Sequence, residues 1–82
     1  MDYAIVTIKT KDETWEADME IPAKMKLKNV ALKVLDTIKA MDESRFEAVH
    51  KLRFIYENKV LNEEATLADY KIWDGSIVHL DC

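Results

Sequence analysis

The 82-residue sequence contains one glycine, one proline and one cysteine. With Gly75 as the only glycine, no glycine-rich loop can cradle a phosphate group. With Cys82 as the only cysteine, no disulfide can form within the chain, which fits a reducing compartment. Phosphate-loop enzymes and small disulfide-stapled domains are therefore excluded.

A basic excess is also absent, since the net charge is −4 and the isoelectric point is about 5.1. This balance argues against a general nucleic-acid binder, which needs a basic surface to displace the counterions of phosphates. No apolar run approaches the length that spans a bilayer, and the first residues do not resemble a secretory signal. We therefore expect a soluble intracellular protein that binds no nucleic acid and does not insert into a membrane.

Positive charge is concentrated in one stretch, since residues 24–39 hold five lysines and a single acidic residue, Asp36. A basic helix face that includes Lys28 and Lys33 is a candidate contact for an acidic partner. The alternative is that these lysines only solvate the outer side of a helix.

Apolar residues recur with a helical period between Leu27 and Met41. Positions i, i+3, i+4, i+7, i+8, i+11 and i+14 of this segment form one stripe on a helix. This is the only long helix that the sequence predicts, and its stripe needs a sheet to pack on. The stripe residues are Leu27, Val30, Ala31, Val34, Leu35, Ile38 and Met41.

The other segments predict short strands and turns. Residues 3–10 are rich in β-branched side chains, and residues 14–21 alternate between apolar and polar, so the two predict a hairpin around a turn at 9–13 that ends at Pro22. Further along, the predicted elements are a short helical turn at 46–50, a strand at 52–56, a turn at 57–59, a short strand at 60–61, a capped helical turn at 66–70, and a last strand at 76–80. The polar segment 42–45 is expected to end the long helix.

This order predicts one α+β domain over residues 1–82, in which a mostly antiparallel sheet buries one face against one helix. The segment from Leu67 to Leu80, with its leucine, aspartate and tyrosine spacing at Leu67, Asp69 and Tyr70, resembles the ubiquitin superfamily. Lys28-Asn29-Val30 after Leu27 is similar to the start of the ubiquitin helix. The resemblance implies a β-grasp fold, with a mixed four- to five-stranded sheet on one long helix and a short helical turn before the last strand.

Within that superfamily the chain most resembles the YukD/EsaB family of type VII secretion systems in Gram-positive bacteria. The resemblance implies a cytoplasmic, noncatalytic adaptor that is not attached to other proteins, needs no cofactor, and contacts other components of the secretion machine. The residues that carry it are Ile21-Pro22-Ala23, Leu27-Lys28-Asn29-Val30, Val34-Leu35-Asp36 with Ile38, and residues 67–80.

Two alternatives remain open at this point. A ubiquitin-type covalent or sulfur-carrying modifier requires a C-terminal diglycine, whereas this sequence ends Leu80-Asp81-Cys82, so we expect no conjugation. The second alternative is an orphan ubiquitin-like interaction domain. Ile55 and His79 match places in the ubiquitin recognition patch, but Asp81 falls where that patch needs an apolar residue, so readers of ubiquitin are expected to bind poorly.

Catalysis would have to use His50, His79 and Cys82. A terminal cysteine lacks the rigid support that a nucleophile needs, and the two histidines have no third ligand at metal-binding spacing. We therefore expect no enzyme and no metal site.

A partner-binding surface is the remaining hypothesis. Arg53, Ile55 and His79 are predicted to share one face, and Trp73 precedes a turn where a large ring is hard to bury. Together with Lys28 and Lys33, these are the candidate contact residues. The alternative for Trp73 is a ring folded over Tyr70 or the rim of the sheet. The partner, the oligomeric state and any disulfide between chains through Cys82 stay open.

Overall fold

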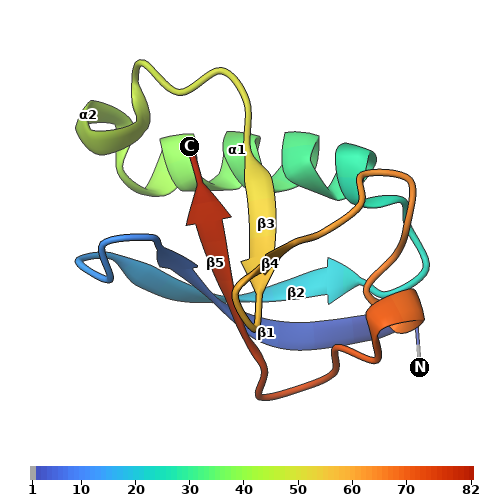
Figure 1. The fold of residues 1–82 in the computed structure, drawn as a ribbon. Coiled ribbons are helices and arrows are strands. Elements are labelled where there is room, and N and C mark those ends of the chain that lie inside the picture. Colours follow the sequence, from blue (N-terminus) through green and yellow to red (C-terminus); the bar gives the residue numbers. More distant parts are fainter. Residues whose placement is uncertain (1) are drawn as a thin grey trace.

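The computed structural model describes residues 2–82, which form a five-stranded mixed sheet with one long helix, α1, lying along one face (Figure 1). The strand order is β2, β1, β5, β3, β4; the central pair β1 and β5 is parallel and the other pairs are antiparallel. This confirms the predicted α+β class and the mixed sheet. The elements in chain order are β1 (Tyr3–Thr10), β2 (Glu16–Pro22), α1 (Leu27–Met41), α2 (Glu43–Phe46), β3 (Arg53–Tyr56), β4 (Lys59–Val60), the 3₁₀ turn η1 (Ala68–Tyr70) and β5 (Ile77–Asp81).

The first hairpin forms as predicted, but its turn is placed differently. Strand β1 has the predicted bounds, Tyr3–Thr10, and Lys9 lies opposite Glu16, so only the overlapping prediction of a turn that starts at Lys9 was wrong. Thr14 belongs to the turn and not to β2, because the Asp12 carboxylate accepts hydrogen bonds from both its backbone N–H and its hydroxyl, at 3.0 and 2.7 Å. An aspartate that binds the backbone two residues on is typical of such turns.

Helix α1 has the predicted bounds, and Leu27, Val30, Val34 and Ile38 are buried beneath it. Met41 was expected in the buried stripe, but its side chain is 56% exposed, at the end of the helix beside β2. Lys26 holds the N-cap position of α1, and among residues 2–82 no side chain caps this helix start. Instead its first two N–H groups donate to backbone carbonyls of the loop 61–67, as described below.

The loop carbonyls take the place of a capping side chain at this helix end. The N–H of Leu27 donates to the carbonyl of Ala65 at 2.8 Å, and the N–H of Lys28 donates to that of Glu63 at 2.9 Å. These bonds satisfy donors that a helix leaves without an internal partner. This cap could not be predicted from local sequence, because the acceptors lie more than thirty positions away along the chain.

The short helix after α1 was predicted at 46–50 and is found at Glu43–Phe46. Asp42 caps it by accepting a hydrogen bond from the N–H of Arg45 at 3.3 Å, which turns the polar segment into a helix start. Phe46 is buried and meets the ring of Trp15 edge-on, with 5.0 Å between the ring centres. Trp15 itself is partly buried and packs against the core.

The remaining turns have recognisable geometry. Glu57 and Asn58 both have positive φ angles, +50° and +65°, which suits the two-residue turn between β3 and β4. At η1, the hydroxyl of Thr66 accepts a hydrogen bond from the N–H of Asp69. The carboxylate of Asp69 in turn accepts one from the N–H of Thr66. This reciprocal pair is the predicted cap.

Candidate partner-binding surface

The face of the sheet opposite α1 carries large apolar side chains that the described residues do not cover. We call this side of the sheet the outer face. Alternation along each strand places these residues on the side away from the core, since Ala4, Val6, Val78 and Phe54 point inward and are buried. Tyr3, Ile5, Val60 and Ile77 are 52%, 50%, 52% and 45% exposed, and Ile55 is half-buried among them.

One row of the outer face crosses all five strands. Val60 lies opposite Ile55, Ile55 opposite His79, His79 opposite Lys9, and Lys9 opposite Glu16. Directly opposed side chains lie close enough to contact each other. The apolar part of the row is therefore at the β4 and β3 end, and the charged part at the β2 end.

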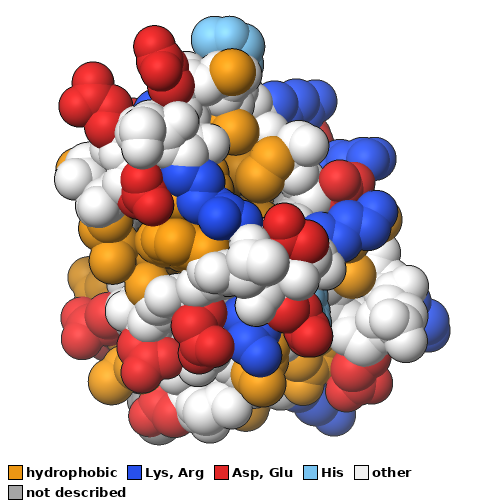
Figure 2. Space-filling model, turned by 90° about the vertical axis from the view of Figure 1, so that its left-hand side faces the viewer, with side chains coloured by type: hydrophobic (Ala, Val, Ile, Leu, Met, Phe, Trp, Pro, Cys, Tyr) orange, Lys and Arg blue, Asp and Glu red, His pale blue; other side chains and the backbone are white. Residues whose placement is uncertain are grey.

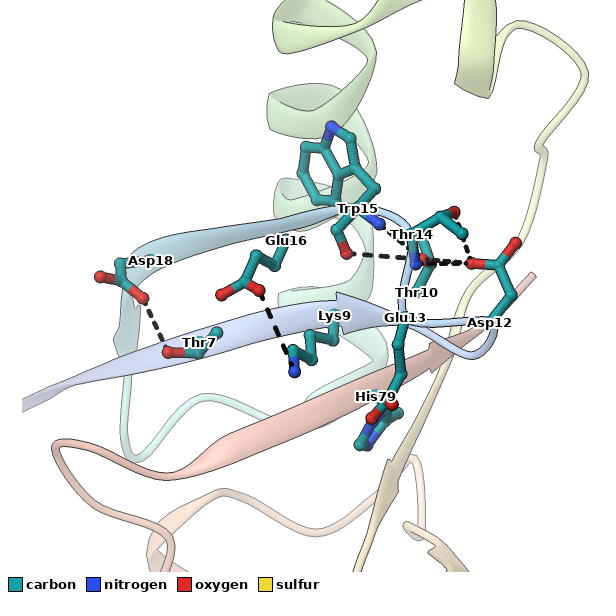
Figure 3. Close-up of polar contacts among 10 residues, drawn as sticks. All are labelled: Thr7, Lys9, Thr10, Asp12, Glu13, Thr14, Trp15, Glu16, Asp18 and His79. Carbon is teal, nitrogen blue, oxygen red and sulfur yellow. Dashed lines mark hydrogen bonds and ion pairs between the residues drawn. The ribbon is translucent and has the colours of Figure 1, made fainter.

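Polar contacts tie the charged part together, as Figure 3 shows. The His79 ring nitrogen Nε2 lies 3.1 Å from the Oε1 atom of Glu13, Lys9 lies 4.0 Å from Glu16, and the Thr7 hydroxyl donates to Asp18 at 2.7 Å. The hydrogen bond with His79 lowers the pKa of the Glu13 carboxyl, and the charge of Lys9 lowers that pKa further. All these groups are exposed or half-buried, so the ion pairs fix orientation more than they add stability.

The structure brings three of the predicted contact residues onto the outer face: Arg53, Ile55 and His79. The guanidinium of Arg53 donates to the carboxylate of Asp81, opposite it on β5, at 2.6 Å. Ile55 is half-buried, and Val60 and His79 flank it on the two neighbouring strands. Trp73 lies outside the sheet, in the loop before β5, and is 37% exposed.

The two candidate lysines of α1 do not form one basic face. Lys28 lines a groove between α1 and β3, whereas Lys33 lines a different groove between α1 and β2. Lys28 lies 2.9 Å from Glu64, which Lys26 also approaches to 3.3 Å. Hydrogen bonds from Lys28 and Lys26 lower the pKa of the Glu64 carboxyl. Part of the positive charge seen in the sequence is thus neutralised within the molecule.

Acidic and basic side chains are mixed over the end of the molecule that carries α2 and the first hairpin. Figure 2 shows this end, where hydrophobic side chains gather on the left of the view between two groups of acidic ones. Arg45 of α2 reaches across to the hairpin, 3.3 Å from Asp12 and in hydrogen-bond contact with the Thr14 hydroxyl. The contact joins α2 to the first hairpin.

The sequence alone did not reveal Tyr3, Ile5, Val60 and Ile77 as surface residues. In β1 both alternating sets begin with apolar residues, so the inward set cannot be chosen from hydrophobicity alone. The outward set does end in Thr7 and Lys9, whereas the inward set ends in Ile8 and Thr10. That difference was the available signal.

The candidate catalytic groups are placed as follows. His50 lies exposed in the loop before β3, His79 on the outer face, and Cys82 after the end of β5. Partial desolvation raises the pKa of the Cys82 thiol, and the charge of Asp81 raises it further. A raised pKa disfavours the thiolate, which is the reactive form.

Residues 2–82 contain neither a metal-binding cluster nor a membrane-spanning helix. Within that range, no three side chains of histidine, cysteine, aspartate or glutamate are arranged to hold a metal ion. In the same range, no helix has both the length and the apolar character needed to traverse a bilayer.

Comparison with known proteins supports a ubiquitin-like fold. A family model described as "WXG100 protein secretion system (Wss), protein YukD" matches residues 3–80. The ubiquitin-like domain of the Mycobacterium tuberculosis type VII secretion system protein ECCD1 superposes with a TM-score of 0.80 at 21% identity, covering 100% of both chains. The EccD5 ubiquitin-like domain from Mycobacterium xenopi gives a TM-score of 0.75 at 16% identity, covering 99% of this chain and 94% of that one. These likenesses confirm the predicted β-grasp fold.

Proposed function

Because the chain belongs to the YukD family of the WXG100 protein secretion system, we propose that it is a noncatalytic adaptor of such a system. It acts in the cytoplasm and binds another protein component of the machine through its outer face. The observation that carries the proposal is the group of apolar side chains on the outer face, Tyr3, Ile5, Ile55, Val60 and Ile77.

Exposed apolar side chains support a binding role because they are clustered. Single apolar residues on a surface are ordinary, but a contiguous group rimmed by polar residues is typical of protein interfaces. Here Ile55 and Val60 oppose each other on β3 and β4. Ile77 lies opposite Thr7 on β1, and Ile5 is the next residue of β1 on the same face. The rim is supplied by Arg53, His79 and Lys9, which pair with Asp81, Glu13 and Glu16 respectively.

The test is a complementation experiment in the organism that carries the gene. Deleting the gene is expected to reduce export of the WXG100 protein, and the wild-type gene is expected to restore it. A variant carrying Ile55→Arg and Ile77→Arg is expected not to restore export, because two buried charges would oppose docking of an apolar partner surface. Both positions face away from the core, so the variant is expected to fold.

A matched control is Leu32→Arg, since Leu32 is 63% exposed on α1 and lies off the outer face. This variant is expected to restore export fully. Restoration by the outer-face double variant, with folding confirmed by circular dichroism, would contradict the proposed surface. Unchanged export after deletion of the gene would contradict the adaptor role itself.

The adaptor is proposed to act without being conjugated. The only glycine, Gly75, lies in the turn before β5, so no pair of glycines occurs in these 82 residues. An intact mass spectrum of the protein isolated from its host is expected to show an unmodified chain. A ladder of larger species that carry this chain would favour the covalent modifier instead.

A further inference from the structure

Strand β2 is the long free edge of the sheet. It pairs with β1 on one side and has no strand on the other among residues 2–82. The orientation of its backbone groups follows from β1. Ile5 donates its N–H to Asp74 and accepts from Gly75, and the N–H of Thr7 donates to the carbonyl of Ser76, so these groups point toward β5.

Residues of β2 that lie opposite Ile5 and Thr7 must therefore direct their own backbone groups outward. Glu20 lies opposite Ile5 and Asp18 lies opposite Thr7. In an antiparallel pair, a residue that makes no ladder hydrogen bond presents its N–H and carbonyl to the other side. The free edge thus offers the backbone donors and acceptors of Glu16, Asp18 and Glu20, a template for an added strand.

The side chains of these same three residues form an acidic row. Glu16, Asp18 and Glu20 are all exposed and lie on the outer side of the sheet. Among residues 2–82, Lys9 is the one basic side chain that forms an ion pair with the row, 4.0 Å from Glu16, and the Thr7 hydroxyl donates to Asp18. The row therefore keeps an excess of negative charge along the edge.

On its inner side, the same edge borders a groove with an apolar floor and a partly charged rim, to which Asp18, Glu20 and Lys33 contribute. The groove has a volume of about 260 Å³ and lies between β2 and α1. Met19 and Ile21 form one wall, and Val34 and the exposed Met41 form the other, with Lys33 and Thr37 on the helix side. Methionine side chains adapt to the shape of an incoming apolar group.

From these features we infer that the β2 edge binds an extended segment of another protein in which basic and apolar residues alternate. The segment adds a sixth strand beside β2. Its basic residues face Glu16, Asp18 and Glu20, because directly opposed residues share one face of a sheet. Its apolar residues point to the other face and enter the groove over Met19 and Met41.

A second copy of the chain does not suit this edge. If two β2 strands paired in antiparallel fashion around Asp18, that residue would meet its own counterpart and Glu16 would meet Glu20. Like charges directly opposite each other destabilise a strand pair. A basic partner strand replaces this repulsion with attraction, so charge selects the occupant.

The experiment uses three peptides of identical length with blocked ends. The first alternates lysine and valine, the second alternates glutamate and valine, and the third holds the lysines and valines of the first in two separate blocks. Binding to the full chain is followed by titration calorimetry and by NMR amide exchange. We expect only the alternating lysine–valine peptide to bind, to protect the amides of Asp18 and Glu20, and to bind more weakly at high salt.

Two variants of one residue separate backbone pairing from charge. Glu20→Gln keeps the outward N–H and removes the charge, and is expected to weaken binding about twofold. Glu20→Pro also removes the N–H and is expected to weaken binding about fivefold more. Proline is tolerated on edge strands where the N–H faces solvent, and β2 already holds Pro22 in the same register.

The inference stands apart from the proposed function, and the outcomes distinguish the two. Ile55→Arg is expected to leave peptide binding unchanged, because Ile55 lies on β3, three strands away from β2. No binding of the lysine–valine peptide overturns the inference, as does equal binding of the glutamate–valine peptide. Equal affinity of the Glu20→Pro and Glu20→Gln variants, or protection confined to the outer-face strands β3 and β5, overturns it as well.

Discussion

The hydroxyl of Tyr70 accepts a hydrogen bond from the backbone N–H of Asn62, with 2.8 Å between the two heavy atoms. The bond ties η1 to the loop 61–67. That loop also supplies the carbonyls of Glu63 and Ala65 that satisfy the start of α1. One tyrosine thus supports both the turn before the last strand and the helix end that lacks a capping side chain.

Replacing this tyrosine tests the arrangement. Tyr70→Phe is expected to lower the free energy of unfolding by about 1 kcal/mol, the usual net value of one hydrogen bond. Chemical denaturation measures the change. Tyr3→Phe is the matched control, because Tyr3 is 52% exposed on the outer face, and it is expected to change stability very little. Equal stability of wild type and Tyr70→Phe would contradict a stabilising role for the bond.

For the buried stripe of α1, we expect a larger loss of stability than for the Tyr70 hydrogen bond. Ile38 is fully buried beneath the helix, so Ile38→Ala removes apolar contacts and leaves a cavity, at a cost of roughly 2–5 kcal/mol. Leu32 lies on the same helix but is 63% exposed, and Leu32→Ala is expected to cost less than about 0.5 kcal/mol. Thermal unfolding of both variants provides the comparison. Similar losses for the two would place the stripe on the wrong side of the helix.

The turn before β5 predicts a backbone effect without a steric one. Gly75 has a φ of +86°, and a Cβ added there would meet nothing within 4 Å. Gly75→Ala is therefore expected to destabilise by about 1 kcal/mol or more through the left-handed backbone alone. Gly75→Asn is expected to lose less, since asparagine tolerates this conformation better than alanine. A higher denaturation midpoint for Gly75→Ala than for Gly75→Asn would exclude the left-handed backbone as the cause.

The elements predicted best were those whose signals are local. The bounds of α1 follow from apolar spacing over fifteen residues, and the cap at η1 follows from Thr66 and Asp69, three positions apart. The capping role of Asp42 was missed, because a polar segment directly after a long helix suggests an end and not a new start. Each of these outcomes depends on residues that are neighbours in the chain.

The candidate surface was predicted only in part, since it depends on which strands are neighbours. Arg53, Ile55 and His79 share a face as expected from alternation within β3 and β5. Val60 and Ile77 join them only through the strand order, and Lys28 and Lys33 prove to line separate grooves. Strand order arises from contacts between distant segments, which the spacing of residues in a sequence does not encode.

The turn of the first hairpin predicts a pH dependence. Hydrogen bonds from Thr14, from its side chain first and its backbone second, lower the pKa of Asp12 from 3.8 to about 2, and a bond from Thr10 adds to this. A carboxyl whose pKa is lower in the folded chain stabilises the fold once it is ionised. Its contribution is therefore fully present above a pH of about 4 and is lost as the pH falls through about 2.

An NMR titration of the Asp12 carboxyl carbon measures this pKa directly, and a midpoint near 2 is expected. Thr14→Ala is expected to raise the midpoint toward 3.8, because it removes the hydroxyl that contributes most. Arg45→Gln is expected to move the midpoint much less, because the charge of Arg45 is the smallest contribution. If Arg45→Gln shifted the midpoint more than Thr14→Ala, charge and not hydrogen bonding would hold the turn. A midpoint of 3.8 in the wild-type protein would mean that the Asp12 turn does not persist in solution.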